Sequence, residues 1–171
     1  YGLSGRTRFD LVVNLLAAKA RLEGKITLFG GDQWRPFLHV DDAALAVFKA
    51  LEAPIQQVNK QVYNVGGMNE NYTLADVAEL IKVQVPDAEI LECGQDGDRR
   101  NYRVDFSKIH HELGFTNQWT LDQGIAQVIA EIDSGRVTDY TDMRFNNAKY
   151  LTEVTEEQMV RSQTRKLHAS L

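Results

Sequence analysis

The sequence has little of several residue types and patterns, and each shortage excludes a class of protein. A single cysteine, Cys93, excludes an intrachain disulfide and a cysteine-based metal site. No apolar run approaches the roughly 18 residues that a membrane-spanning helix needs, and no signal peptide is visible. Lysine and arginine number 19 against 24 aspartates and glutamates, so the net charge is −5. We therefore expect no nucleic-acid or membrane partner, and the lone cysteine fits a reducing cytoplasm.

Several catalytic motifs are also missing. The glycine pairs Gly30-Gly31 and Gly66-Gly67 lack the spacing of a dinucleotide-binding loop, in which glycines follow a strand and open a helix. No tyrosine is followed four residues later by lysine, the pair that lowers a tyrosine pKa for proton transfer. The sequence also has no serine–lysine, zinc-protease or phosphate-loop motif. We predict no catalytic, cofactor-binding or metal-binding residues in this chain.

The residues that are present predict one mixed α/β unit of short strands and about five helices. A chain of 171 residues, 43% of them hydrophobic, is long enough to bury a core. Apolar residues at helical or alternating spacing define the elements, and in the first helix they are Leu11, Leu15, Ala18 and Leu22. Thr73 with Asp76, and Thr120 with Gln123, have the spacing of capping boxes at the start of two helices. The predicted helices are 10–22, 42–52, Thr73 to just before Pro86, Ser107 to Gly114 and Thr120 to Gly135, and the predicted strands are 26–29, 37–40, 61–65, 88–91 and 102–106.

The last 36 residues, 136–171, differ in character from the rest. Residues 139–149 are polar and irregular, and residues 155–168 could form a charged helix that docks on a partner or frays. We therefore divide the chain into a main unit, 1–135, and a polar tail, 136–171. The chain begins with tyrosine instead of methionine, which indicates a piece of something longer, with removal of a tag as the alternative.

The most informative stretch is residues 26–42, ITLFGGDQWRPFLHVDD. A strand-like run ends in a glycine turn, and Arg35 begins a second such run. This arrangement can hold one cation over a cleft, which suits an anionic ligand such as a diphosphate. The alternative is a surface arginine stacked on Trp34. Further along, Arg99 and Arg100 lie in a basic loop, where Arg100 is the freer to reach a ligand, unless the loop is simply solvated.

Four other polar residues have two readings each. Asn14 interrupts an apolar helical run, so it is either a structural hydrogen-bonding group or a ligand contact. His39 stands alone in a strand-like run, where a structural role is more common than a catalytic one. Asp41 and Asp42 could do acid–base work, but capping the next helix, with Asp41 as the candidate, is the more common role.

Five segments in a fixed order resemble the NAD-dependent nucleotide-sugar epimerase/dehydratase family, the extended short-chain dehydrogenases. They are Tyr1-Gly2 with residues 8–14, then 28–42, 62–67, 100–109 with 112–115, and 119–125. The resemblance spans residues 1 to about 135. It implies the C-terminal part of a Rossmann-type fold, without the N-terminal dinucleotide-binding half.

The resemblance also implies roles for individual residues. Asn14, Arg35 and Arg100, with Arg99 as a second candidate, would contact the diphosphate or sugar of a nucleotide-sugar. The segment that ends at Phe29 would lie against the nucleotide base. The intact family enzymes use NAD or NADP, and we expect this chain alone to bind neither.

The sequence therefore predicts the nucleotide-sugar-binding portion of an NAD-dependent epimerase or dehydratase, inactive alone because the glycine-rich loop and the catalytic tyrosine–lysine pair are absent. The alternatives are a standalone nucleotide-sugar-binding module and a non-catalytic fragment that self-associates. In the last case Leu45, Phe48 and Leu51 would form an exposed apolar patch, which drives association. The expected partners are a nucleotide-sugar and either a second copy of the chain or a dinucleotide-binding domain, and the expected location is the cytoplasm.

Overall fold

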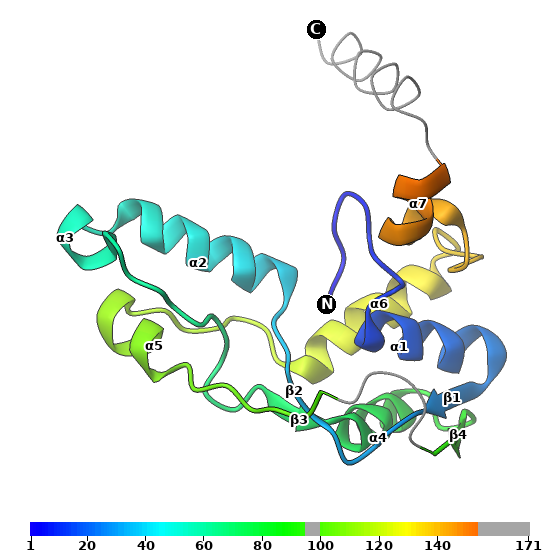
Figure 1. Cartoon of the computed structure of the whole chain (residues 1–171). Helices are drawn as coiled ribbons and strands as arrows, with labels where there is room; N and C mark the ends of the chain where they lie inside the picture. Colours follow the sequence, from blue (N-terminus) through cyan, green and yellow to red (C-terminus); the bar gives the residue numbers. More distant parts are fainter. Residues whose placement is uncertain (95–99, 154–171) are drawn as a thin grey trace, which may run out of the picture.

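The computed structural model describes residues 1–94 and 100–153 (Figure 1). Over these residues the chain is a mixed α/β protein, as predicted. Its helices are α1 (Val12–Glu23), α2 (Val40–Glu52), α3 (Ile55–Val58), α4 (Leu74–Gln84), α5 (Ser107–Leu113), α6 (Leu121–Asp133) and α7 (Asn147–Glu153). Its strands are β1 (Lys25–Leu28), β2 (Trp34–Pro36), β3 (Asn71–Thr73) and β4 (Glu89–Glu92), and Met143–Phe145 forms a 3-10 turn, η1.

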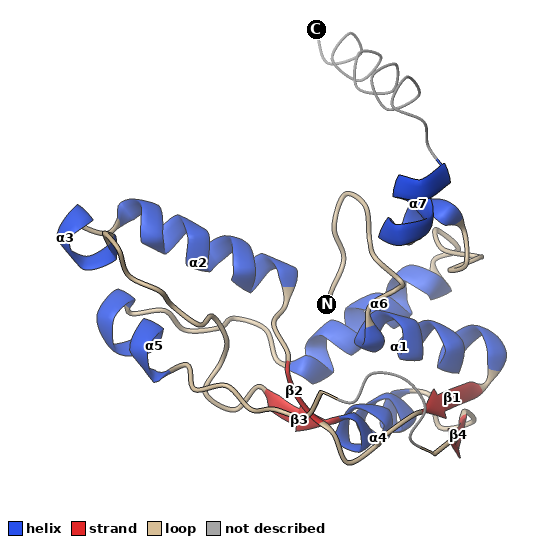
Figure 2. Cartoon of the chain, viewed as in Figure 1, coloured by secondary structure: helices blue, strands red, loops and turns tan. Residues whose placement is uncertain are grey.

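The elements form two parts that meet at β2 and β3 (Figure 1). In the larger part α1 and α4 pack on β1, which pairs in parallel with β4, and α6 packs on both helices. In the smaller part α2, α3 and α5 form an arm that extends away from α1 and α6 (Figure 2). The strands β2 and β3 pair antiparallel between the two parts, with Pro36 opposite Asn71 at the end of the ladder.

The main core lies in the larger part, where Ile26, Ile81 and Ile125 of three different elements are fully buried. Two of its helices begin with the predicted capping boxes. The Thr73 hydroxyl accepts from the Asp76 N–H at 3.0 Å, and the Thr120 hydroxyl accepts from the Gln123 N–H at 3.3 Å. These caps satisfy backbone donors that a helix start leaves open. The core therefore gives a rigid support to the surface above it.

The buried face of α1 differs from the predicted one. The predicted stripe of Leu11, Leu15, Ala18 and Leu22 is buried only at Ala18, and Leu22 is 42% exposed. The buried face consists of Val13, Asn14, Leu16, Ala17, Ala18 and Ala20. This helix is apolar around most of its circumference, so spacing alone does not define one face. The small alanines allow α6 to approach closely, and the larger apolar residues remain on the opposite side.

Three predicted strands are wrong, at residues 37–40, 61–65 and 102–106. None of these segments forms a ladder with another strand in the described parts of the chain. Alternation can suggest a strand, but a strand also requires a backbone partner. Val104 bonds to a side chain instead: its N–H donates to Asn71 Oδ1 at 2.9 Å, and its carbonyl accepts from Asn71 Nδ2 at 3.0 Å.

The start of α2 is also different, because His39 takes the N-cap position that was predicted for Asp41. The His39 Nδ1 accepts from the Asp41 N–H at 3.2 Å, and its Nε2 lies 3.0 Å from Gln127 Oε1. The imidazole is 1% exposed and stacks on Trp119 with ring centres 4.0 Å apart. His39 is therefore a structural hydrogen-bonding group, the more common of the two predicted roles.

The part of the tail that the structure describes is more ordered than predicted, since it contains η1 and α7. Phe9 packs edge-on against Phe145 at 5.3 Å, and the Phe9 N–H donates to the Phe145 carbonyl at 3.0 Å. Val137 is buried in the main core. The division of the chain at residue 135 stays a prediction, and the predicted helix over residues 155–168 lies outside the described residues.

A buried carboxyl group lies where the two parts meet. Glu70 is 6% exposed, and in the described chain its Oε2 has no hydrogen-bond partner. Burial raises the pKa of Glu70 to about 7, and the Asp42 carboxylate adds to the effect. Glu70 in turn raises the pKa of the Tyr72 and Tyr1 hydroxyls, after burial, which is the larger cause. The junction thus holds a carboxyl group that titrates near neutral pH.

The raised pKa of the Glu70 carboxyl group implies that the stability of the fold depends on pH. Between the ordinary pKa of 4.5 and the raised value of about 7, the folded state binds more protons than the unfolded state. The stability that a protonated Glu70 contributes is therefore present at pH 4.5 and is lost as the pH rises to 7. We expect Glu70→Gln to increase the free energy of unfolding by about 2 kcal/mol at pH 8 and to change it little at pH 4.5. Urea unfolding of both proteins at the two pH values measures this, and an equal effect at both would contradict it.

Candidate functional site

A cleft of about 690 Å³ lies between α1 and the segment that runs from β1 through β2. The outward side of α1 contributes one wall with Val12, Leu15 and Lys19, and Thr27 and Phe29 lie on the opposite wall. Tyr1 and Leu38 line the cleft where it approaches the arm. The volume falls in the range of small-molecule sites, and a mostly apolar lining with a few charged groups is typical of them.

Four charged residues line the cleft, and three of them are basic: Asp10, Lys19, Arg35 and Arg100. The single carboxylate is already paired, because Arg8 donates to both Asp10 oxygens at 2.9 and 3.0 Å. This bond from Arg8 lowers the pKa of Asp10 below its usual value, so the carboxyl group stays ionised and neutralised at pH 7. The other three charged residues of the lining are basic, which suits an anionic ligand.

Arg35 is fixed on the β2 wall. Its Nη1 donates to the Trp34 carbonyl at 2.9 Å and its Nη2 to Gln33 Oε1 at 2.6 Å, and the guanidinium lies 5.6 Å from the centre of the Tyr102 ring. The predicted alternative, a stack on Trp34, involves a different arginine, because Arg103 lies 4.3 Å over that ring. A guanidinium oriented by such contacts loses little side-chain entropy when it binds an anion.

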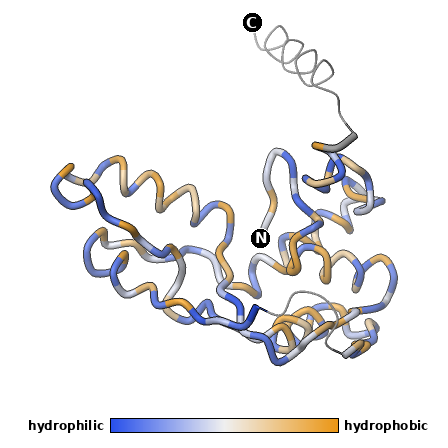
Figure 3. Tube along the Cα trace, in the orientation of Figure 1, coloured by the Kyte–Doolittle hydropathy of each residue, from blue (hydrophilic) through white to orange (hydrophobic). Residues whose placement is uncertain are grey.

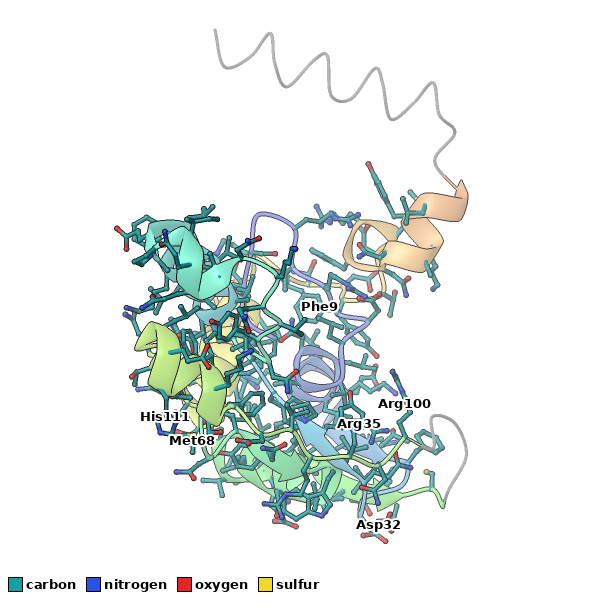
Figure 4. The ribbon with its side chains drawn as sticks, turned by 60° about the vertical axis from the view of Figure 1, so that its left-hand side comes forward. Phe9, Asp32, Arg35, Met68, Arg100 and His111 are labelled. Atoms are coloured by element: carbon teal, nitrogen blue, oxygen red, sulfur yellow. The ribbon has the colours of Figure 1, made fainter. Side chains whose placement is uncertain are left out.

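Three of the five residues predicted to bind substrate share this cleft: Phe29, Arg35 and Arg100. Figure 4 shows Arg35 and Arg100 on the same side of the molecule, next to α1. Phe29 follows β1 and is 44% exposed, so its ring is accessible from the cleft that it lines. An aromatic ring and two arginines in one cleft match the base and the diphosphate of a nucleotide.

Of the other two predicted residues, Asn14 is buried and is not part of the cleft lining. Asn14 is 1% exposed; its Oδ1 accepts from the Gly2 N–H at 3.0 Å, and its Nδ2 donates to the Gly2 and Arg8 carbonyls at 3.3 and 2.9 Å. These three bonds fit the structural alternative for Asn14, and a ligand contact stays a prediction. Arg99 lies outside the described residues.

Sequence reasoning missed Lys19, Thr27 and Gln33, all of which line the cleft. One signal for Lys19 was available. Val12, Leu15 and Lys19 recur at intervals of three and four, so they share one side of α1. A lysine within an otherwise apolar helical stripe indicates that this side of the helix is partly covered by other segments but does not belong to the hydrophobic core.

The described residues do not fit the diphosphate of a dinucleotide cofactor. Such a site needs a glycine-rich turn between a strand and the start of a helix. Gly30, at φ +61°, lies in the turn before β2, and Gly66-Gly67 leads toward β3. Gly66 is needed for packing, because a Cβ there would lie 2.4 Å from the Phe106 ring. Within the same residues, no helix combines the length and the apolar character that crossing a membrane requires.

The fold is that of part of a Rossmann-type extended short-chain dehydrogenase. The UDP-glucuronic acid 4-epimerase from Bacillus cereus, solved with UDP-glucuronic acid and NAD, aligns with a TM-score of 0.65 and 25% identity. The alignment covers 78% of this chain and 42% of that one. The dTDP-glucose 4,6-dehydratase from Bacillus anthracis, solved with NAD, gives 0.62 and 25% over the same shares, 78% and 42%.

Sequence comparison agrees with this class. Residues 1–66 match the NAD dependent epimerase/dehydratase family. A dTDP-glucose 4,6-dehydratase from Escherichia coli is 32% identical over 119 residues, which are 63% of this chain and 32% of that protein. Both comparisons thus find similarity to NAD-dependent epimerases and dehydratases, in agreement with the sequence resemblance. It spans about a third of the length of the curated relatives that it matches.

Proposed function

We propose that this chain is the substrate-binding portion of an NAD-dependent nucleotide-sugar epimerase or dehydratase, and that the cleft binds a nucleoside diphosphate sugar. The observation that carries the proposal is the meeting of Phe29, Arg35 and Arg100 in one cleft, after each was singled out from the sequence. The two arginines would neutralise the diphosphate, and Phe29 would stack on the base. The sugar would then extend toward Tyr1 and Leu38, where the cleft approaches the arm.

We also propose that these 171 residues bind their substrate without turning it over. In such enzymes the nicotinamide carries the redox step, and the protein supplies binding and orientation. The glycine-rich loop for that cofactor and the tyrosine–lysine pair for proton transfer are both absent from the sequence. The role left to the chain is to hold and orient the nucleotide. The cytoplasmic location stays a prediction.

Titration calorimetry of the chain with UDP, dTDP, GDP and CDP tests the binding. We expect saturable heat with at least one of them, and no epimerised or dehydrated product when the matching nucleotide-sugar is incubated with the chain and NAD. Inorganic pyrophosphate serves as the ligand without a base, and it should bind more weakly. No heat with any of the four nucleotides would overturn the proposal, and product formation would overturn the claim of inactivity.

The arm supports the predicted need for a protein partner. Along α2, Val47, Phe48 and Leu51 are 62, 55 and 79% exposed, and their helical spacing puts them on one side of the helix. Much of α2 is coloured as hydrophobic in Figure 3. Leu45 was wrongly predicted to be part of this patch. It packs instead against the small cluster of Ala46, Ile109 and Phe115. We propose that a second copy of the chain, or a dinucleotide-binding domain, covers this side of α2.

Self-association of the isolated chain through this side of α2 can be tested directly. We expect sedimentation velocity to show an oligomer at high micromolar concentration, because exposed apolar side chains at helical spacing bury one another on contact. Phe48→Asp with Leu51→Asp should give a monomer of unchanged helix content. Lys49→Asp, on the same helix, is the matched control. A wild-type monomer throughout the concentration range would contradict the prediction.

A further inference from the structure

Lys19 is a cation in the cleft that no comparison and no sequence motif assigns. Its side chain is half-buried on α1 and lines the cleft, and it makes no hydrogen bond or ion pair with the residues that the structure describes. Its ammonium group has three donors and no acceptor, so it takes its acceptor groups from water or from a ligand. In an otherwise apolar wall, such a group marks a place where a ligand oxygen fits.

The position of Lys19 along the cleft indicates which oxygen that is. Gly24, at φ +67°, reverses the chain, so that β1 runs back along α1 (Figure 1). Lys19 lies about 7.5 Å before this turn at the rise of a helix, and Thr27 lies about 10 Å after it at the rise of a strand. The two side chains therefore stand at nearly the same level, on opposite walls.

Phe29 is close to that level. It shares one side of the β1 segment with Thr27, because these two residues alternate with Ile26 and Leu28, which are buried in the core. A base that stacks on Phe29 consequently presents its edge to Lys19 and Thr27. The diphosphate of the same nucleotide would lie at Arg35 and Arg100, so a contact of Lys19 with the base is favoured over a contact with phosphate.

We infer that Lys19 is the residue that selects the nucleotide base, by donating a hydrogen bond to the exocyclic carbonyl of the base. This inference rests on the proposed function and names its substrate class. Uracil and thymine carry a carbonyl at O4 and guanine at O6, whereas cytosine and adenine carry an amine at the corresponding position. An amine would turn its N–H groups toward the ammonium, so the site accepts the first group of bases and rejects the second.

UDP and CDP form the matched pair of probes, because they differ only along one edge of the base: uracil has the carbonyl and an adjacent N3–H, and cytosine has the amine and an unprotonated N3. We expect the intact chain to bind UDP about tenfold more tightly than CDP in titration calorimetry. In Lys19→Met the ratio should fall to within about twofold, through loss of UDP affinity. In Lys19→Glu the ratio should reverse, because a carboxylate accepts from the cytosine amine. Lys25→Met, an exposed residue close to the same turn that does not line the cleft, should leave the ratio unchanged.

Three other results would contradict the role of Lys19. Equal binding of UDP and CDP to the wild type overturns the role of Lys19 and leaves the proposed function standing. An equal loss of both affinities in Lys19→Met also overturns it, since that result places Lys19 on phosphate or ribose. Failure of all nucleotides to bind overturns the proposed function, and the base selection with it.

Discussion

Replacement of Arg35 by glutamine is expected to lower the affinity of the chain for UDP by about a hundredfold. The guanidinium is positioned over the cleft by its bonds to the Trp34 carbonyl and to Gln33 Oε1. Glutamine preserves part of the hydrogen-bonding capacity but removes the charge and the planar pair of donors that match a phosphate. The loss should affect UDP, CDP and pyrophosphate alike, because all three present phosphate oxygens. Titration calorimetry of the variant measures it.

Arg103→Gln is the matched control for this measurement. Arg103 lies over the ring of Trp34 and does not line the cleft, yet it carries the same charge close to the same strand. We expect its variant to bind UDP within about twofold of the wild type, since distant exposed charges are screened by salt. Equal losses in the two variants would mean that the effect comes from net charge alone. Wild-type affinity in Arg35→Gln would place the diphosphate elsewhere.

Arg35 and Phe29 were predictable from the sequence because their placement depends on local chain order. A strand, a turn and a short strand put both residues on one surface whatever the rest of the fold does. Thr73 and Thr120 were predictable for a similar reason, since a capping box is complete within four residues. Such local features can be predicted without knowing which distant segments of the chain pack together.

The features that were not predictable depend on those distant contacts. The cleft side of α1 is set by where α6 packs, so the spacing of Lys19 with Val12 and Leu15 could not by itself place this lysine in a cleft. Residues 61–65 have the alternation of a strand, but a strand forms only when a neighbour supplies a ladder. His39 displaces Asp41 as the cap of α2 because Gln127 and Trp119, far along the chain, hold its ring in place.

The same long-range dependence makes Asp42 a residue whose loss should strongly destabilise the fold. Its carboxylate is 1% exposed and accepts from the Gln118 N–H at 2.7 Å and the Trp119 N–H at 3.1 Å. These bonds connect the first turn of α2 to the segment that leads into α6. Hydrogen bonds to a charged group contribute about 1.5 to 3 kcal/mol each, so Asp42→Ala should lower the free energy of unfolding by about 4 kcal/mol.

Urea unfolding of the variant tests this at a fixed pH. Asp42→Asn should cost about 2 kcal/mol, because its amide oxygen keeps one bond while its NH₂ group faces the second N–H. Asp41→Ala is the control, and its exposed side chain should change the free energy by no more than about 0.5 kcal/mol. Since Asp42 lies outside the cleft lining, folded Asp42→Ala should still bind UDP. Wild-type stability in Asp42→Ala would show that the arm is held to the larger part by apolar packing, with the carboxylate adding nothing.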